Sequence, residues 1–183
     1  MPRFIFAVLA GVTVLANAAP ASAQEIFCTV VGVKQGTFQG DRIGGRAASQ
    51  IPVLSLTEEI TRPFDAATGL AAGMRTHKPL IIVKELDASS PQFFLATVTG
   101  ETLRSVTCTF YRAFRSGTGS GETHPYFRIT LTNAIVVDYK DAGDAINGAA
   151  TGDERERISL TYQRIELTDL DTSTVEEDAW LSN

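Results

Sequence analysis

The chain has 183 residues, with 16 Lys and Arg residues against 21 Asp and Glu residues and a formal net charge of −5. Proteins that bind nucleic acid need a basic surface to neutralise phosphates, so this acidic balance argues against DNA or RNA as a partner. Hydrophobic residues make up 44% of the chain, enough to form one core. We find no internal repeat and expect a single domain.

The first 23 residues have the features of a secretory signal peptide. Arg3 precedes an uncharged apolar run over residues 4–15. The small-residue sequence Ala21-Ser22-Ala23 then provides a cleavage site. We therefore predict a signal peptide at residues 1–23.

The alternative for this segment is an uncleaved membrane anchor. Asn17 and Pro20 interrupt the run before it reaches the roughly 20 apolar residues that a spanning helix needs. Cleavage would leave residues 24–183 as the mature domain, with a net charge of about −6 and no further spanning segment. We expect this mature form to be secreted or periplasmic, without contact to a membrane.

Cys28 and Cys108 are the two cysteines of the chain, and alternation places each on the apolar face of a strand. In an oxidising compartment they are candidates for one disulfide. Closing so long a loop would contribute about 4–5 kcal/mol in the chain-entropy model. The alternative is that they are two small buried hydrophobic residues that never meet, which is common for cysteine.

Short runs of β-branched and aromatic residues predict strands through most of the chain. These runs cover residues 25–33, 51–60, 79–86, 106–114, 127–137 and 158–167. The run at 79–86 predicts a strand covered on both faces. The last run changes parity across Gln163 and Arg164, where a bulge would restore its facing. The fold class is therefore mainly β, a small antiparallel barrel or sandwich.

One short helix is predicted at about residues 90–99, flanking the sheet. Ser89-Ser90-Pro91 is a helix start, in which a Ser hydroxyl accepts a free first-turn N–H, and Gly100 is the stop. An apolar stripe is expected to dock this helix on the sheet. The stripe consists of Pro91, Phe94, Leu95 and Val98, widened by Phe93 and Ala96.

A long connection over about residues 61–77 contains Pro63, Gly69 and Gly73. A structureless loop of this length in a compact domain is usually either disordered or functional. Leu70 and Met74 favour the functional interpretation, because they suggest that the loop packs against something. The acidic segment 169–178, in contrast, predicts a solvated tail that ends in one anchoring aromatic residue, Trp180.

A search for catalytic or metal-binding chemistry gives little. His77 and His124 have no cysteines or carboxylates at metal-ligand spacing, so we expect both at the surface. The glycines between 117 and 121 indicate a hairpin turn and no phosphate loop. Glu85 and Asp87 flank a strand end without an evident partner, and no Gly-x-Ser-x-Gly elbow occurs. We expect no catalytic residue, no cofactor and no metal, and hence no enzyme.

The ordered set of motifs nevertheless resembles the Hcp family, the haemolysin co-regulated proteins of type VI secretion. The resemblance covers roughly residues 51–167, and no single piece of it is specific. Its first part is Thr68-Gly69, Gly73, His77-Lys78-Pro79-Leu80-Ile81-Ile82, Lys84-Glu85-Leu86-Asp87 and Ser89-Ser90-Pro91. Its second part is Gly100-Glu101, Phe110-Tyr111-Arg112, Ile129, Leu131, Asn133-Ala134, Arg157-Ile158-Ser159-Leu160-Thr161-Tyr162 and Ile165.

The resemblance implies a small barrel that assembles with itself as a homohexamer, whose rings stack into a hollow tube. It also implies a spike protein at the tip of the tube, a contracting sheath around it and small effector proteins inside it. In the family, the loop that corresponds to residues 61–78 reaches toward a neighbouring ring. The candidates for this ring-stacking contact are Arg62, Asp65, Leu70, Met74, Arg75, His77 and Lys78.

The expected leader departs from the family pattern, because the resemblance alone implies assembly in the cytoplasm followed by secretion. The sequence therefore leaves two alternative functions from different classes. One is a structural tube or ring component of a type VI secretion system. The alternative is an exported Hcp-like β-domain that acts as a stand-alone periplasmic or extracellular binding module.

Overall fold

The computed structural model describes residues 24–42, 45–115, 121–142 and 154–180, so the expected signal peptide and most of the glycine-rich turn near residue 117 lie outside the described part. The strands are β1 (Glu25–Gly32), β2 (Gly36–Thr37), β3 (Ile51–Val53), β4 (Ser55–Thr57), β5 (Ile60–Thr61), β6 (Thr76–His77), β7 (Leu80–Glu85), β8 (Thr102–Arg115), β9 (Gly121–Ala142), β10 (Arg155–Thr161), β11 (Arg164–Asp169) and β12 (Thr174–Ala179). The helix, α1, spans Ser90–Thr99. The predicted mainly β class with one short helix is confirmed. Within the described ranges, no helix is long and apolar enough to cross a membrane.

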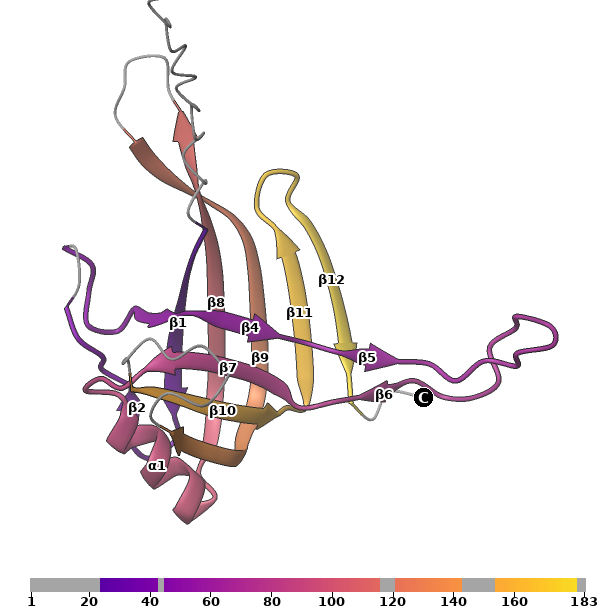
Figure 1. The fold of residues 1–183 in the computed structure, drawn as a ribbon, viewed down its shortest axis with the longest axis horizontal. Helices are drawn as coiled ribbons and strands as arrows, with labels where there is room; N and C mark the ends of the chain where they lie inside the picture. Colours follow the sequence, from indigo (N-terminus) through magenta and orange to yellow (C-terminus); the bar gives the residue numbers. More distant parts are fainter. Residues whose placement is uncertain (1–23, 43–44, 116–120, 143–153, 181–183) are drawn as a thin grey trace, which may run out of the picture.

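Ten of these strands form one antiparallel sheet that closes on itself. Its hydrogen-bonded order is β2-β1-β8-β9-β10-β7-β4. β3 pairs with β1, whereas β4, which follows β3 after a single residue, pairs with β7. The segment 51–57 therefore joins the two sides of the sheet into a barrel (Figure 1). Its interior holds aliphatic residues from opposite walls, such as Val30, Ile82 and Leu160.

β9 bends at the point where its neighbouring strand changes. Residues 127–132 pair with β11, whereas residues 135–142 pair with β10. Between them, Asn133 has a φ of 51°, a left-handed conformation that Asn tolerates better than most residues. The bulge expected at 163–164 is instead a break between two strands, because β10 and β11 follow different halves of the bent β9.

The helix packs on the barrel through Phe93 and Ala96, the residues that widen the predicted stripe, and not through the stripe itself. Phe93 and Ala96 are buried, and the Phe93 ring meets Phe38 edge to face with centroids 5.1 Å apart. Phe94 and Val98 are exposed, so the prediction that their stripe docks the helix is wrong. The helix carries apolar residues on two sides, and periodicity alone does not choose between them.

The two ends of α1 differ in how far they follow the prediction. Gly100 ends the helix in the left-handed conformation, with a φ of 62°, as predicted. Ser89 makes no side-chain cap. Its hydroxyl instead donates to Asp87 Oδ1 at 2.5 Å, and the Ser90 hydroxyl accepts from the Asp87 N–H at 3.0 Å. Asp87 therefore organises the helix start in place of a Ser cap.

A buried charged cluster joins β7, β10 and the start of α1. Lys84 has no exposed surface, and its ammonium group donates to Glu156 Oε1 at 2.7 Å and to Asp87 Oδ1 at 2.8 Å. The second oxygen of Glu156 accepts from the Tyr139 hydroxyl at 2.7 Å. Burial, together with the Glu156 hydrogen bond and charge, raises the pKa of Tyr139. The expectation that Asp87 has no partner is therefore wrong.

Cys28 and Cys108 lie opposite each other on β1 and β8, with Cα atoms 4.0 Å apart. A disulfide joins their sulfur atoms across a sequence separation of 80 residues. Both residues are buried among the core side chains. The bond therefore ties the first strand of the domain to the middle of the barrel wall.

Candidate functional site

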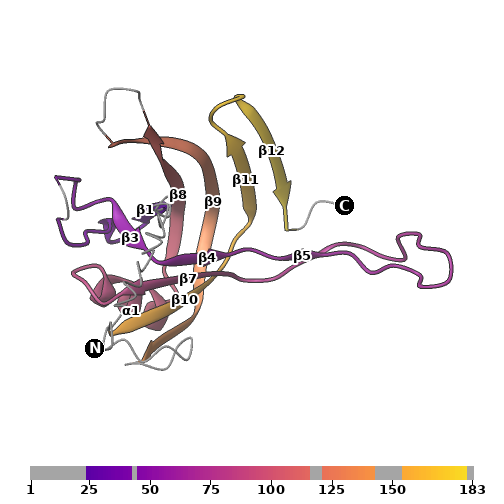
Figure 2. The ribbon, with the colours of Figure 1, turned by 45° about the horizontal axis from the view of Figure 1, so that its top comes forward.

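The connection after β5 is not a structureless loop but an arm, residues 60–77, that extends far from the barrel (Figures 1 and 2). At its base β5 pairs with β6, as Ile60 with His77 and Thr61 with Thr76. Further out, Phe64 and Ala71 form an isolated antiparallel bridge. The arm is therefore a two-stranded β-hairpin, and the segment predicted to be functional is an ordered projection.

A compact turn over residues 65–70 closes the end of the arm. Asp65 Oδ1 accepts from the Ala67 N–H at 2.7 Å, and the Asp65 carbonyl oxygen accepts from the Gly69 N–H at 2.8 Å. Gly69 has a φ of 70°, which favours glycine at this position. The Asp65 N–H then donates to the Leu70 carbonyl oxygen at 2.8 Å. Asp65, one of the predicted contact residues, shapes the turn.

The outer part of the arm presents large apolar side chains to solvent. Leu70 is 69% exposed and Met74 is 65% exposed. Phe64, which the sequence analysis did not single out, is 69% exposed. Together Phe64, Leu70 and Met74 form what we call the arm tip. Arg62, another predicted contact residue, is also exposed.

The remaining predicted contact residues lie at the base of the arm, where they bind other elements. Arg75 makes a two-pronged ion pair with Asp178 of β12. His77 is only 4% exposed, so the prediction that it lies at the surface is wrong. Lys78 forms an exposed ion pair with Glu59 at 2.6 Å. The predicted contact set therefore contains both exposed residues of the outer arm and residues that hold the base of the arm.

His77 lies in an aromatic cluster at the arm base. Its ring stacks on Trp180 with centroids 5.3 Å apart, and Tyr162 meets both rings edge to face. His77 Nε2 lies 3.1 Å from Asp178 Oδ2 and Nδ1 lies 3.1 Å from the Tyr162 hydroxyl. Because a carboxylate only accepts, Nε2 carries a proton. Trp180 is the anchoring aromatic that the sequence predicted. Residues 171–177 are exposed, as predicted, but segment 169–178 is largely strand β12 and its preceding turn, not an irregular tail.

Burial and nearby carboxylates shift the pKa values of groups in and beside this cluster. Burial raises the pKa of Glu58. The electrostatic effect of His77 offsets part of this increase, and the charge of Glu59 adds to it. Burial likewise raises the pKa of Tyr162, and the charges of Glu58 and Asp178 add to the shift. The Tyr162 hydroxyl therefore keeps its proton near neutral pH.

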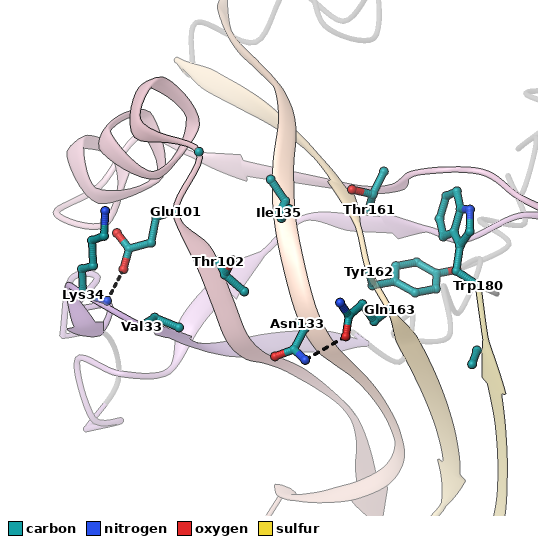
Figure 3. Close-up of a pocket in the computed structure, with 12 residues that line it drawn as sticks. Val33, Lys34, Glu101, Thr102, Asn133, Ile135, Thr161, Tyr162, Gln163 and Trp180 are labelled. Carbon is teal, nitrogen blue, oxygen red and sulfur yellow. Dashed lines mark hydrogen bonds between the residues drawn. The ribbon is translucent and has the colours of Figure 1, made fainter. Parts of the chain in front are cut away.

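An open groove of about 1170 Å³ runs from this cluster toward the end of α1 (Figure 3). Tyr162 and Trp180 line one end, and Glu101 lies at the other. Near its middle, the Asn133 amide donates to Gln163 Oε1 at 2.9 Å. The lining is a mixture of apolar, amide and hydroxyl groups, with the charged residues Lys34 and Glu101 at one end.

Glu101 is fixed in the wall of this groove. Its Oε1 accepts from the Lys34 N–H at 2.6 Å and from the Gln35 N–H at 2.9 Å, and Oε2 accepts from the Gln35 side-chain amide at 2.9 Å. Burial acts to raise the pKa of Glu101, but these hydrogen bonds outweigh it, so the pKa lies below its ordinary value. A Cβ on Gly32 would lie 2.5 Å from Glu101 Oε1, so a side chain at this position would displace the Glu101 carboxylate.

Comparison with known families and structures identifies the family of the chain. A family model described as "Type VI secretion system effector, Hcp" matches residues 27–168. The chain belongs to the Hcp family. The Major exported protein of Pseudomonas aeruginosa strain PAO1 is 31% identical over 171 residues, which cover 87% of this chain and 97% of that protein.

Solved Hcp structures have the same fold. The Hcp1 protein from E. coli EAEC 042 superposes with a TM-score of 0.73 at 26% identity, over 86% of this chain and 99% of that one. The secreted protein Hcp3 from Pseudomonas aeruginosa superposes with a TM-score of 0.69 at 26% identity, over 87% and 100% of the two chains. Membership in the Hcp family confirms an Hcp tube subunit of type VI secretion, and the free-standing binding module is not favoured.

Sequence reasoning about this Hcp protein missed the partners of its arm. Asp178 was one of several carboxylates in an acidic segment, and nothing local distinguished it from Glu176 or Glu177. Tyr162 was noted only as the last residue of the motif at residues 157–162. Phe64 had one available signal, since it is a large apolar residue inside a connection that was already suspected of making contacts.

Proposed function

We propose that this Hcp protein forms hexameric rings that stack into a tube, and that the arm makes the contact from one ring to the next. The single observation that carries the proposal is the arm itself, an ordered hairpin that projects from the barrel with its apolar tip uncovered (Figure 2). Contiguous exposed apolar side chains on a protein surface mark interaction sites.

Burial of the arm tip against the next ring would stabilise such a contact. Burying a Leu, Met or Phe side chain contributes about 1.5–3 kcal/mol each. Three such side chains on the tip of each arm, repeated around a six-membered ring, supply a strong stacking interaction. The contact is heterologous, so it propagates from ring to ring and builds a tube.

The sheet also has an edge that ring closure would cover. In the described part of the sheet, residues 174–177 of β12 pair with β11 alone, which leaves this part of the strand's outer edge open. Exposed edges promote pairing with other chains, and closing them against identical neighbours in a cyclic ring ends that growth. The ring and the stack therefore use different surfaces of the molecule.

The further partners follow from the function of a tube subunit. We propose a spike protein at the tip, a sheath outside and small effector proteins in the lumen. Residues 1–23 act as a cleaved leader in this proposal, and the mature protein is secreted or periplasmic. The relative in Pseudomonas aeruginosa carries the name Major exported protein, which supports export.

The proposal is tested by replacing Leu70 and Met74 with Asp in one variant. Both residues are exposed, so folding and ring formation should be unchanged, while charge in an apolar contact should abolish stacking. Negative-stain electron microscopy separates single rings from stacks, and thermal unfolding checks the fold.

Val98→Asp is the matched control, because Val98 is similarly exposed but lies on α1. This control should stack as the unmodified protein does. Stacks of undiminished length in the Leu70 and Met74 variant would refute the role of the arm.

A further inference from the structure

The base of the arm is held by one residue of the C-terminal hairpin. Asp178 of β12 accepts from both Nε and Nη2 of Arg75, and it also lies 3.1 Å from Nε2 of His77. Arg75 Nη2 donates in addition to the Ala179 carbonyl oxygen at 3.2 Å. Two residues of the returning strand of the arm are thus tied to adjacent positions of β12.

These contacts matter because the arm has little else to fix its direction. The β5–β6 pairing consists of two residue pairs, and a two-stranded hairpin is marginally stable by itself. Residues 61–74 are exposed, so the outer arm does not pack on the barrel. The direction of the arm must therefore be set where it leaves the body, at residues 75–77.

The geometry at this point is suited to the task. The side chains of Arg75 and Asp178 are 21% and 30% exposed, so their pairing is only partly screened by water. A planar guanidinium that binds both carboxylate oxygens fixes orientation as well as distance. The Trp180 ring stacked on His77 blocks sideways movement of β6.

A small rotation at the base would be magnified at the tip. Leu70 is six residues from Thr76, up to about 20 Å along an extended strand. Rotating the base by about 10° would then displace the tip by about 3 Å, comparable to the spacing of side chains along a strand. Stacking of rings would not tolerate such freedom without loss of affinity.

We propose that Asp178 is the positioning residue that sets the direction of the arm and so couples the β11–β12 hairpin to ring stacking. This inference rests on the proposed function of the arm as the ring-to-ring contact. The role that we assign to Asp178 does not require contact with the neighbouring ring. It acts through Arg75 and His77.

Asp178→Asn is the direct test, since the amide keeps the shape of the side chain but removes its charge and one acceptor. Arg75→Gln breaks the same interaction from the arm side, and Glu177→Gln is the matched control. Glu177 neighbours Asp178 on β12, but it pairs with Arg164 at 3.2 Å at the surface. Hydrogen exchange of the arm amides measures its freedom, and electron microscopy of rings and stacks measures assembly.

We expect Asp178→Asn and Arg75→Gln to speed exchange of residues 60–77 by about tenfold or more. Exchange in β8 and the formation of rings should stay unchanged, stacks should shorten, and Glu177→Gln should behave as the unmodified protein. Unchanged hydrogen exchange of the arm in both Asp178→Asn and Arg75→Gln would overturn the proposal. Faster exchange of the arm together with stacks of undiminished length would also overturn it. In that case the variant with Leu70→Asp and Met74→Asp separates the two proposals. If its stacks persist, the proposed function of the arm is wrong; if its stacks are lost, only the role of Asp178 is wrong.

Discussion

Lys84 shows how a single residue ties the helix start to the barrel wall. Its ammonium group has no exposed surface and is satisfied by Asp87, Glu156 and the Glu85 carbonyl oxygen. Glu156 is also fully buried. Removing one member of such a cluster leaves an uncompensated charge inside the protein, which costs more than the intact pair contributes.

We predict that Lys84→Met lowers the free energy of unfolding by about 3–5 kcal/mol, because Glu156 and Asp87 would lose their cation. Urea denaturation of the two proteins measures the difference. Lys78→Met is the control, since Lys78 and Glu59 are about half exposed and such a pair contributes about 1 kcal/mol or less. Similar losses in the two variants would contradict the assignment of the Lys84 cluster as a buried network.

Glu101 predicts a dependence of stability on pH. Its pKa in the folded protein lies below the ordinary value of 4.5, because hydrogen bonds to Gln35 and Lys34 outweigh the effect of burial. The folded state thus favours the ionised form. Its stabilising contribution is complete above the ordinary pKa and is lost as the pH falls through the folded pKa.

The variant Glu101→Gln should therefore be less stable than the unmodified protein at pH 7, by about 1–3 kcal/mol for lost charged hydrogen bonds. The difference between the two proteins should shrink as the pH falls below about 4.5. Chemical denaturation at pH 7, 5 and 3.5 measures it. A difference that stays constant over this range would show that the charge of Glu101 makes no contribution.

At the scale of elements, α1 and the arm show what sequence patterns resolve. The helix bounds and the Gly100 stop were predictable, because Pro and Gly act locally on the backbone. The docking face was predicted only in part, with Phe93 and Ala96 at its margin, because the burial of Phe93 depends on its contact with Phe38, which is distant in sequence. The same holds for Asp87, whose partner Lys84 is held in place by Glu156 on another strand.

The arm was predictable in extent but not in form. Glycine, proline and apolar residues in a long connection indicated a functional segment, and the resemblance to the Hcp family implied the same. Its hairpin structure depends on non-local pairing of Phe64 with Ala71 and of β5 with β6. Its anchor on Asp178 joins residues about 100 positions apart, which no local pattern encodes.

At the scale of the whole molecule, the alternation of apolar and polar residues predicted an antiparallel β protein. It did not predict how the sheet closes into a barrel. Closure depends on the short segment 51–57, whose two halves pair with β1 and β7 on opposite sides of the sheet. The bend of β9 at Asn133 likewise follows from its neighbours. The resulting molecule has a barrel body, an open strand edge at β12 and a projecting arm, the parts that a stacking ring requires.

Electron microscopy of the purified protein at high concentration tests the central claim most directly. Our account predicts six-membered rings that stack into hollow tubes, with density for each arm reaching the adjacent ring. Monodisperse monomers without rings would contradict it, as would tubes in which the arms do not touch the next ring.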